Sequence, residues 1–148
     1  SGGQTGVDRG ALDVARDFNK LEINKYNTTI NFSGWCPKGR KAEDGQIPME
    51  YPLKETETEQ YSERTELNVK DSEATLILLL EKNEIDRGTQ YTIDKVKEFE
   101  KPYIIVYLSD NHQENVKRVL GWLNEHQINH LNVSGPRESN AEGIYNKA

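Results

Sequence analysis

The sequence predicts an α/β fold in which a mostly parallel central sheet lies between two layers of helices. Residues 75–80 form a continuous apolar run, as expected of a parallel strand that helices cover on both faces. Segments with apolar residues at helical spacing alternate with β-rich segments along the chain. The length of 148 residues is that of one ordinary domain, which can bury a core without disulfides.

The first half of the chain contains two predicted helices and one predicted strand. Apolar residues recur at steps of three and four from Val7, so a helix is expected to begin there and to end near Asn19. A strand is expected over residues 31–35, followed by a long loop that extends to residue 51. Thr56 and Glu59 have the spacing of a capping box, which predicts a helix over residues 56–70.

The second half continues the alternation of strand and helix. The central strand at 75–80 is followed by a predicted helix over residues 89–99, which Pro102 stops. Residues 103–108 predict a strand, residues 116–123 lie in another helix, and residues 131–133 predict a short last strand. This order predicts right-handed crossovers and one Rossmann-like three-layer domain over the whole chain, with functional loops at the carboxyl ends of the strands.

Composition excludes several classes of function. Nineteen basic and 25 acidic residues give a net charge of −6, which argues against a nucleic-acid surface. No apolar run is long enough to span a membrane and no signal-peptide flanks occur, so a cytoplasmic protein is expected. The three histidines lack metal-ligand spacing, so no metal site is expected. Because the chain begins inside a glycine cluster, a further strand is expected before Ser1.

Glycine-rich segments are expected at three strand-to-helix connections. Residues 1–6 (SGGQTG) lead into the first helix, Gly88-Thr89 follow the central strand, and residues 134–139 (SGPRES) follow the last strand. Glycine lets the N–H groups at a helix N-terminus approach an anion. Each segment alone could be a tight turn. Because the loops after parallel strands meet at one edge, we expect one composite phosphate site, with Arg137 and Arg87 as forked donors.

A charged loop over residues 35–45 (WCPKGRKAEDG) is a second candidate for ligand binding. Lys38 and Arg40 flank Gly39 and could hold an anion, although a solvated surface loop would have the same composition. Cys36 could be a soft metal ligand or a reactive thiol, and a buried inert cysteine is an equal alternative.

Acidic and polar residues outside the glycine loops could complete the site. Glu43, Asp44 and Asp8 are candidate general acids or bases, or could hold the edge of a ribose or pterin. Asp8 could instead serve as a first-turn acid favoured by the helix dipole. Arg64 and Asn68 share a helical face where an apolar stripe would normally lie, which predicts that this face lines a site.

Four motifs in order also carry a family resemblance. They are SGGQTGVDRGALDVA at 1–15, GWCPKGRKAEDG at 34–45, RTELNVKDSEATLIL at 64–78 and LNVSGPRES at 131–139. Together they resemble the molybdenum cofactor carrier family, which is similar to the lonely guy and lysine-decarboxylase-like proteins. The resemblance implies a Rossmann-type sheet, a homo-oligomer (dimer or tetramer), and binding of the molybdenum cofactor (molybdopterin) through its terminal phosphate. Molybdoenzymes or cofactor-biosynthesis proteins are the implied partners.

The chain departs from these relatives at the loop after the central strand. The carrier family usually has Gly-Gly-Thr where this chain has Arg87-Gly88-Thr89. The lonely guy enzymes carry PGGxGTxxE, of which only Gly88-Thr89 remain, and Thr92 stands in place of the glutamate. The glycosidic hydrolysis of those enzymes is therefore not expected.

Two functions follow from these observations. The first is a non-catalytic carrier that binds and protects a phosphate-bearing pterin cofactor. The second is a nucleotide-binding or nucleotide-hydrolysing enzyme, with Asp8, Glu43 or Asp44 as the acid or base. The predicted ligand-binding residues are Gly2, Gly3, Gln4, Thr5, Gly6, Asp8, Arg9, Lys38, Gly39, Arg40, Glu43, Asp44, Arg64, Asn68, Gly88, Thr89, Gly135, Arg137 and Ser139.

Overall fold

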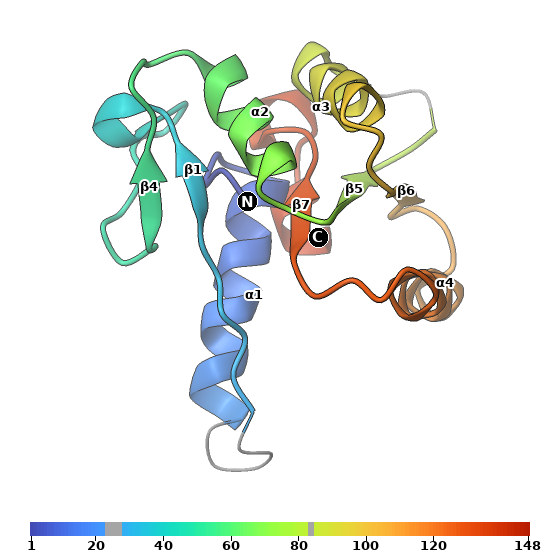
Figure 1. Cartoon of the computed structure of the whole chain (residues 1–148). Coiled ribbons are helices and arrows are strands. Elements are labelled where there is room, and N and C mark those ends of the chain that lie inside the picture. The colour runs from blue at the N-terminus through green and yellow to red at the C-terminus, as the bar shows by residue number, and fades with distance from the viewer. Residues whose placement is uncertain (23–27, 83–84) are drawn as a thin grey trace.

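A three-stranded parallel sheet forms the centre of the computed structural model, which describes residues 1–22, 28–82 and 85–148 (Figure 1). The strands are β5 (Ala74–Leu79), β6 (Tyr103–Tyr107) and β7 (Leu131–Ser134), in the spatial order β6-β5-β7. Thr75 lies opposite Tyr103 of β6 and Asn132 of β7. The three strands predicted for the second half of the chain are therefore confirmed, to within one residue at each end.

The central strand, β5, is apolar on both of its faces. Ile77 and Leu79 are fully buried and pack with Ile93 on one side of the sheet. Leu78 packs with Val106 in a separate cluster on the other side. Successive side chains of a strand point to opposite faces, so a continuous apolar run requires a layer of helices on each side.

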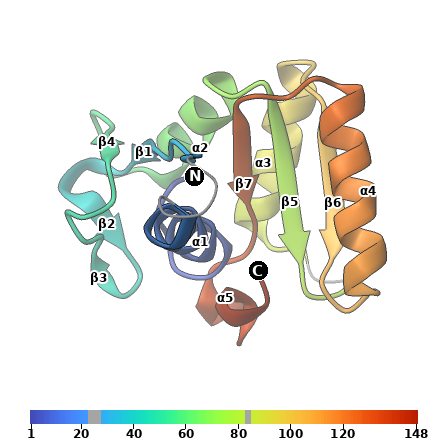
Figure 2. The same ribbon diagram turned by 90° about the horizontal axis from the view of Figure 1, so that it is seen from below.

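Helices supply these two layers. Helix α3 (Arg87–Glu98) covers one face, and α4 (His112–Glu125) lies on the other, as Figure 2 shows. On the face of α4, α1 (Val7–Glu22) packs against β7 and the short C-terminal helix α5 (Ile144–Lys147). On the face of α3 lies α2 (Tyr61–Lys70). The predicted Rossmann-like α/β class is confirmed.

The second helix begins later than the capping box predicts. Its N-cap is Gln60, and Thr56 instead donates its hydroxyl to the carbonyl of Thr58. The carboxylate that reaches back to free N–H groups is that of Glu63, which accepts from the backbone of Thr58 at 3.0 Å. The prediction from Thr56 and Glu59 was therefore wrong by five residues, because the acid in the first turn of the real helix is Glu63.

The strand predicted at 31–35 occurs as β1 (Gly34–Cys36), shifted toward the C-terminus, and the predicted long loop is instead part of a small lobe over residues 34–55. Strand β1 pairs in parallel with β4 (Leu53–Glu55), and β2 (Lys41–Ala42) forms a hairpin with β3 (Gly45–Gln46) after the 3-10 turn η1 (Lys38–Arg40). The lobe has its own apolar cluster, which contains Leu12, Cys36, Ala42, Ile47, Tyr51 and Leu53. Cys36 is buried, and this burial raises the pKa of its thiol, as expected of an inert core cysteine.

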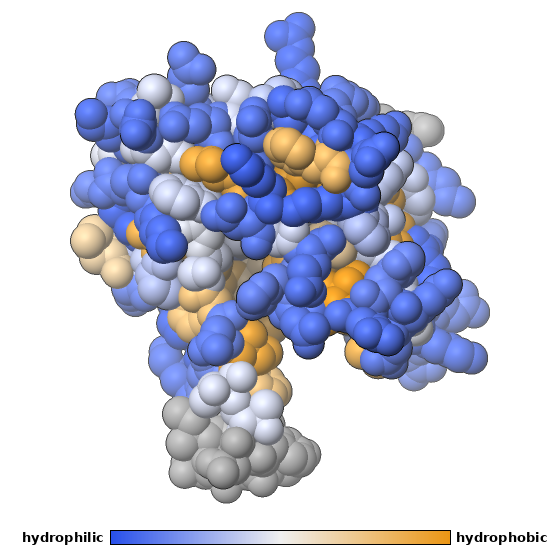
Figure 3. Space-filling model, in the orientation of Figure 1, coloured by the Kyte–Doolittle hydropathy of each residue, from blue (hydrophilic) through white to orange (hydrophobic). Residues whose placement is uncertain are grey.

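The face of the molecule seen in Figure 3 is mostly hydrophilic, in keeping with the 30% of charged residues. Among the described residues, no helix is long and apolar enough to cross a membrane. The same residues contain no cluster of histidine, cysteine, aspartate and glutamate that could hold a metal ion.

Candidate anion-binding site

Loops from three parts of the chain meet at the carboxyl edge of the sheet. The first turn of α1 contacts the loop after β7, where the N–H of Val7 donates to the carbonyl of Pro136 at 3.3 Å. The N–H of Glu138 in that loop donates to the Thr5 hydroxyl at 3.2 Å. On the other side, the Asn140 amide donates to Asp86, the N-cap of α3, at 2.5 Å. The loop after β7 therefore contacts both residues 1–6 and the N-terminus of α3, although no strand precedes residues 1–6 in the part of the chain that the structure describes.

Two glycines allow this close approach. Gly6 has a φ of +73°, and a Cβ placed there would lie 2.5 Å from the carbonyl oxygen of Pro136. A Cβ at Gly135 would lie 2.4 Å from the carbonyl oxygen of Leu78. Any larger residue would push the loop after β7 away from α1 and from β5, because both contacts are with backbone atoms.

An acidic side chain lies where these loops meet. The carboxylate of Glu43, at the tip of the β2–β3 hairpin, accepts hydrogen bonds from the Thr5 hydroxyl and from both the N–H, at 3.1 Å, and the hydroxyl of Ser139. The Arg137 guanidinium lies 3.8 Å from the same carboxylate. We call the Thr5 hydroxyl and the two Ser139 donors the anion seat.

The seat stabilises negative charge. Burial by itself would raise the pKa of Glu43, but the hydrogen bonds from Ser139 and Thr5 and the charge of Arg137 lower it below its usual value. The seat also lies at the N-terminus of the 16-residue helix α1, where the helix dipole favours an anion. Glu43 is therefore ionised at neutral pH and is held as an anionic ligand would be.

Gln4 supports the seat and has one unsatisfied donor. Its side-chain oxygen accepts from the N–H groups of Thr5 and Glu43, both at 3.0 Å, which ties the hairpin tip to the glycine loop. Its side-chain nitrogen is buried and has no hydrogen-bond partner among the described residues. Buried polar groups are nearly always paired, so an unsatisfied donor beside an anion seat indicates a site that completes its bonding with another group.

A cavity of about 380 Å³ adjoins the seat and shares Thr5 with it. The lining residues are Thr5, Gly6, Arg9, Asp13, Asp44, Tyr51, Glu138, Tyr145 and Asn146. Arg9 donates to the carbonyl of Gly3 and to Asp44, and its guanidinium lies 5.7 Å from the centre of the Tyr51 ring. The cavity therefore combines an aromatic wall, a cation and carboxylates.

Two tyrosine hydroxyls converge on one carboxylate in this cavity. Asp13 accepts from Tyr51 at 2.7 Å and from Tyr145 at 2.6 Å. Burial and the hydrogen bond to Asp13 raise the pKa of Tyr51 to about 12. The hydrogen bond to Asp13 also raises the pKa of Tyr145, so both tyrosines remain protonated, and the bonds to Asp13 fix their rings in place.

Arg137 lies between the seat and the N-terminus of α3. Its guanidinium stacks over the Tyr61 ring at 5.5 Å, which brings the polar face of α2 to the site. Asp86 accepts a hydrogen bond from the N–H of Thr89 at 2.6 Å. The Asp86 carboxylate therefore already caps the N-terminus of α3, where the sequence predicts that Gly88 and Thr89 bind an anion. Burial opposes ionisation of Asp86, but the bonds from Thr89 and Asn140 lower its pKa. The Thr89 hydroxyl is buried without a partner among the described residues.

Arg40 lies away from the seat. Its guanidinium is buried and donates to the backbone carbonyls of Ile47, Pro48, Tyr51 and Leu53 at 2.8–3.2 Å. These contacts hold the lobe of residues 34–55 together. Lys38 is exposed, and the Gly39 N–H donates to Glu55, so the three residues of η1 are not brought to the seat.

Three other predicted site residues, Asp8, Arg64 and Asn68, connect elements of the fold. Arg64 of α2 donates to Asp8 of α1 at 2.6 Å, and both side chains are largely buried. Gly2 makes room for this pair, because a Cβ there would lie 2.0 Å from the guanidinium. Asn68 bonds the N–H and the carbonyl of Trp35, which ties α2 to β1.

Residue patterns did not indicate every member of the site. Asp86 could have been found, because an aspartate three residues before Thr89 fits an N-cap. Tyr51, Asp13 and Tyr145 come from separate elements and meet only through the fold.

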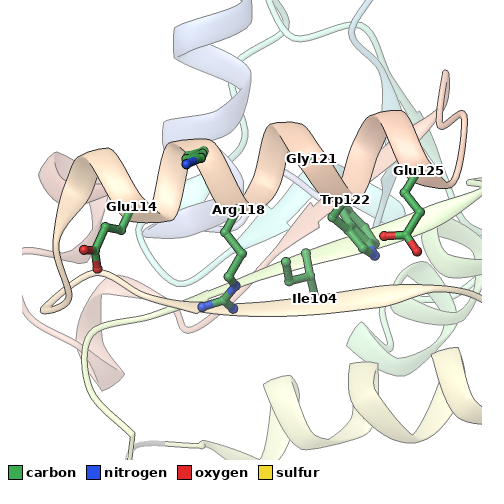
Figure 4. Close-up of a pocket in the computed structure, with 7 residues that line it drawn as sticks. Ile104, Glu114, Arg118, Gly121, Trp122 and Glu125 are labelled. Carbon is green, nitrogen blue, oxygen red and sulfur yellow. The ribbon is translucent and has the colours of Figure 1, made fainter.

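A second hollow, of about 530 Å³, lies between α4 and β6 (Figure 4). Arg118 and Trp122 line it together with Ile104, and the guanidinium of Arg118 donates to the carbonyl of Ile105. None of the glycine loops contributes to this hollow.

Fold and site together define a Rossmann-like α/β protein with an anion seat at the carboxyl edge of its parallel sheet. The chain belongs to the circularly permuted YpsA SLOG family, which it matches over residues 1–148. It is similar to a crystal structure described as "Putative molybdenum carrier protein" from Syntrophus aciditrophicus SB, with a TM-score of 0.86 and 37% identity over 99% of this chain and 85% of that chain. No curated protein matches the chain. The family resemblance of the four motifs is confirmed.

Proposed function

We propose that this protein is a carrier that binds a small phosphate-bearing heterocycle, and that its cargo is the molybdenum cofactor. The observation that carries the proposal is the anion seat, where an ionised carboxylate is held by donors from two glycine-rich loops. The relative from S. aciditrophicus is described as a molybdenum carrier, and this likeness supports the choice of cargo.

A phosphate group suits the donors of the seat. Three hydrogen-bond donors from Thr5 and Ser139, with Arg137 beside them, match an oxyanion with several acceptor oxygens. The Gln4 side-chain nitrogen, which lacks a partner among the described residues, supplies a further donor close to the seat. We assign the terminal phosphate of the cargo to this seat.

The ring system of the cargo would lie in the adjoining cavity. Its volume of about 380 Å³ is within the range of small-molecule sites and suits a bicyclic heterocycle. Tyr145, which is partly exposed, offers a ring face, and the carboxylates of Asp44 and Glu138 offer acceptors for the ring N–H groups of a pterin or purine. Thr5 lines both sites, so one ligand can reach both.

Binding and protection of this cargo need no bond-breaking step. Arg137 would neutralise the phosphate, the glycine loops would orient it, and the walls of the cavity would shield the ring from water. A homo-oligomeric state, a cytoplasmic location and transfer to molybdoenzymes or cofactor-biosynthesis proteins are further parts of the proposal.

The second candidate is an enzyme that acts on a nucleotide. Among the three acids suggested for it, Asp8 is paired with Arg64 and Glu43 is held in the seat. Asp44 is the most accessible, since 47% of its side chain is exposed at the cavity. Turnover of a nucleotide panel that is lost in Asp44→Asn, with the fold intact, would favour this candidate over the carrier.

Protein purified from its host tests the carrier proposal directly. Native mass spectrometry should show a bound pterin phosphate, and elemental analysis should show molybdenum in proportion to it. Arg137→Ala should reduce cofactor occupancy about tenfold without a change in melting temperature, because one charge-assisted contact is lost from a surface loop. Lys38→Ala, which removes an exposed cation of η1, is the control. Wild-type protein that carries nucleotide and no pterin would refute the choice of cargo.

A further inference from the structure

The tip of the β2–β3 hairpin makes three kinds of contact with the ligand loops. Glu43 fills the anion seat, the N–H of Glu43 donates to Gln4, and Asp44 forms a forked ion pair with Arg9 at 3.1 and 3.3 Å. Two consecutive carboxylates therefore lie on the same loops that would receive an anionic ligand. The ligand cannot enter the seat while Glu43 lies there.

The contacts of Glu43 differ in kind from those of Asp86. Asp86 caps its own helix three residues away, which is ordinary local capping. Glu43 reaches residues that are 38 and 96 positions distant in the chain. Its contacts join separate elements, so they can break without unfolding a helix.

The hairpin is short, so the position of its tip depends on the contacts that Glu43 and Asp44 make with the ligand loops. Strands β2 and β3 are two residues long each. The exposed Gly45 has a φ of +115°, and no atom of the residues that the structure describes lies within 4 Å of where its Cβ would be. Ala42 is buried in the lobe and anchors the base of the hairpin. Rotation of the tip about residues 42–45 would remove Glu43 from the seat and leave the core of the lobe unchanged.

We propose, on the basis of the phosphate seat assigned above, that Glu43 is a built-in competitor of the ligand and that the hairpin tip is a gate. The carboxylate occupies the seat in the free protein, and a phosphate dianion displaces it. Charge governs the exchange, because Glu43 and phosphate are negative and cannot share the donors of Thr5 and Ser139. Removal of the charge at residue 43 should therefore strengthen phosphate binding.

Inorganic phosphate is the probe, since it tests the seat without the ring cavity. Titration of the wild type and of Glu43→Gln at pH 7.5 and constant ionic strength would be followed by the backbone amide NMR signals of Thr5 and Ser139. We expect at least tenfold tighter binding in Glu43→Gln, equivalent to about 1.4 kcal/mol. Glu43→Asp keeps the charge on a side chain one methylene shorter, which should fit the donors less well, so it should also bind phosphate more tightly than the wild type.

A matched control separates occupation of the seat from general charge. Glu142→Gln removes one negative charge from an exposed residue near the same loop and should leave the affinity at the wild-type value. The double variant Glu43→Gln with Arg137→Ala should bind phosphate less tightly than Glu43→Gln alone. This result would show that the increase in affinity arises at the seat.

The possible outcomes distinguish the proposal that Glu43 competes with the ligand from the proposal that the seat binds phosphate. Equal affinity in the wild type and Glu43→Gln, with shifts at Thr5 and Ser139, would overturn the gate and keep the seat. Weaker binding in Glu43→Gln would also overturn it and would make Glu43 a ligand contact. If no variant shows phosphate-dependent shifts at these two residues, both the gate and the proposed function fail.

Discussion

Substitution of Arg40 by alanine should destabilise the protein strongly and leave the anion seat in place. The guanidinium donates four hydrogen bonds to the carbonyls of Ile47, Pro48, Tyr51 and Leu53. A hydrogen bond to a charged group contributes about 1.5–3 kcal/mol, and each carbonyl left unsatisfied costs about 1–3 kcal/mol. Because these terms are not additive and some carbonyls regain water, we expect a net loss of about 4 kcal/mol.

Urea unfolding followed by circular dichroism measures this loss. A domain of about 150 residues loses roughly 2–4 °C in melting temperature per kcal/mol, so Arg40→Ala should melt about 8–16 °C lower. The control is Lys38→Ala, whose exposed side chain should change stability by less than about 0.5 kcal/mol. A loss in the free energy of unfolding below about 1 kcal/mol, together with weaker phosphate binding, would refute the structural role of Arg40. Arg40 would then be a ligand-binding residue, as the sequence predicts.

Three further substitutions test the framework of the site. Gly6→Ala should cost at least about 2 kcal/mol, because it combines a positive φ with a Cβ 2.5 Å from the carbonyl of Pro136; an unchanged melting temperature would contradict the close approach. Arg64→Met should cost about 3–5 kcal/mol because it leaves Asp8 buried and unpaired, and adding Asp8→Asn should recover part of the loss. Asp86 has a lowered pKa, so its contribution to stability is present above the unfolded pKa of about 3.9 and is lost as the pH falls through the folded pKa. The difference in stability between wild type and Asp86→Asn should therefore shrink as the pH falls from 5 to 2, and a constant difference would argue against an ionised cap.

Local pattern was sufficient for the elements of the central domain. The apolar run of β5 and the helical spacing from Val7 and Thr89 depend on neighbouring residues, and these elements occur where the sequence predicts them. Helix α1 continues to residue 22, past the predicted end near Asn19, because its last turn has no breaking residue.

Pattern failed for residues 34–55, where long-range contacts determine the structure. Strands of two or three residues have too few side chains to show a period. The lobe is held by its apolar cluster and by a buried cation, Arg40, that bonds carbonyls up to 13 residues away. In the sequence, a buried structural arginine and an exposed ligand-binding arginine look the same.

At the candidate site, too, the sequence does not show which residues face one another, and here an acid lies where cations are predicted. The sequence assigns Lys38 and Arg40 of the charged loop at 35–45 to the anion site, but Arg40 is buried in the lobe. The cation beside the seat is Arg137, from the loop after β7. The group held in the seat is instead an acid, Glu43, from the charged loop. Residue types define the donors and acceptors that a loop can offer, but only the fold decides which face one another. An internal carboxylate in a phosphate seat satisfies the donors of Thr5 and Ser139 in the free protein. The same contact makes binding an exchange of anions, which is why the affinity of the site should depend on a residue that need not touch the bound ligand.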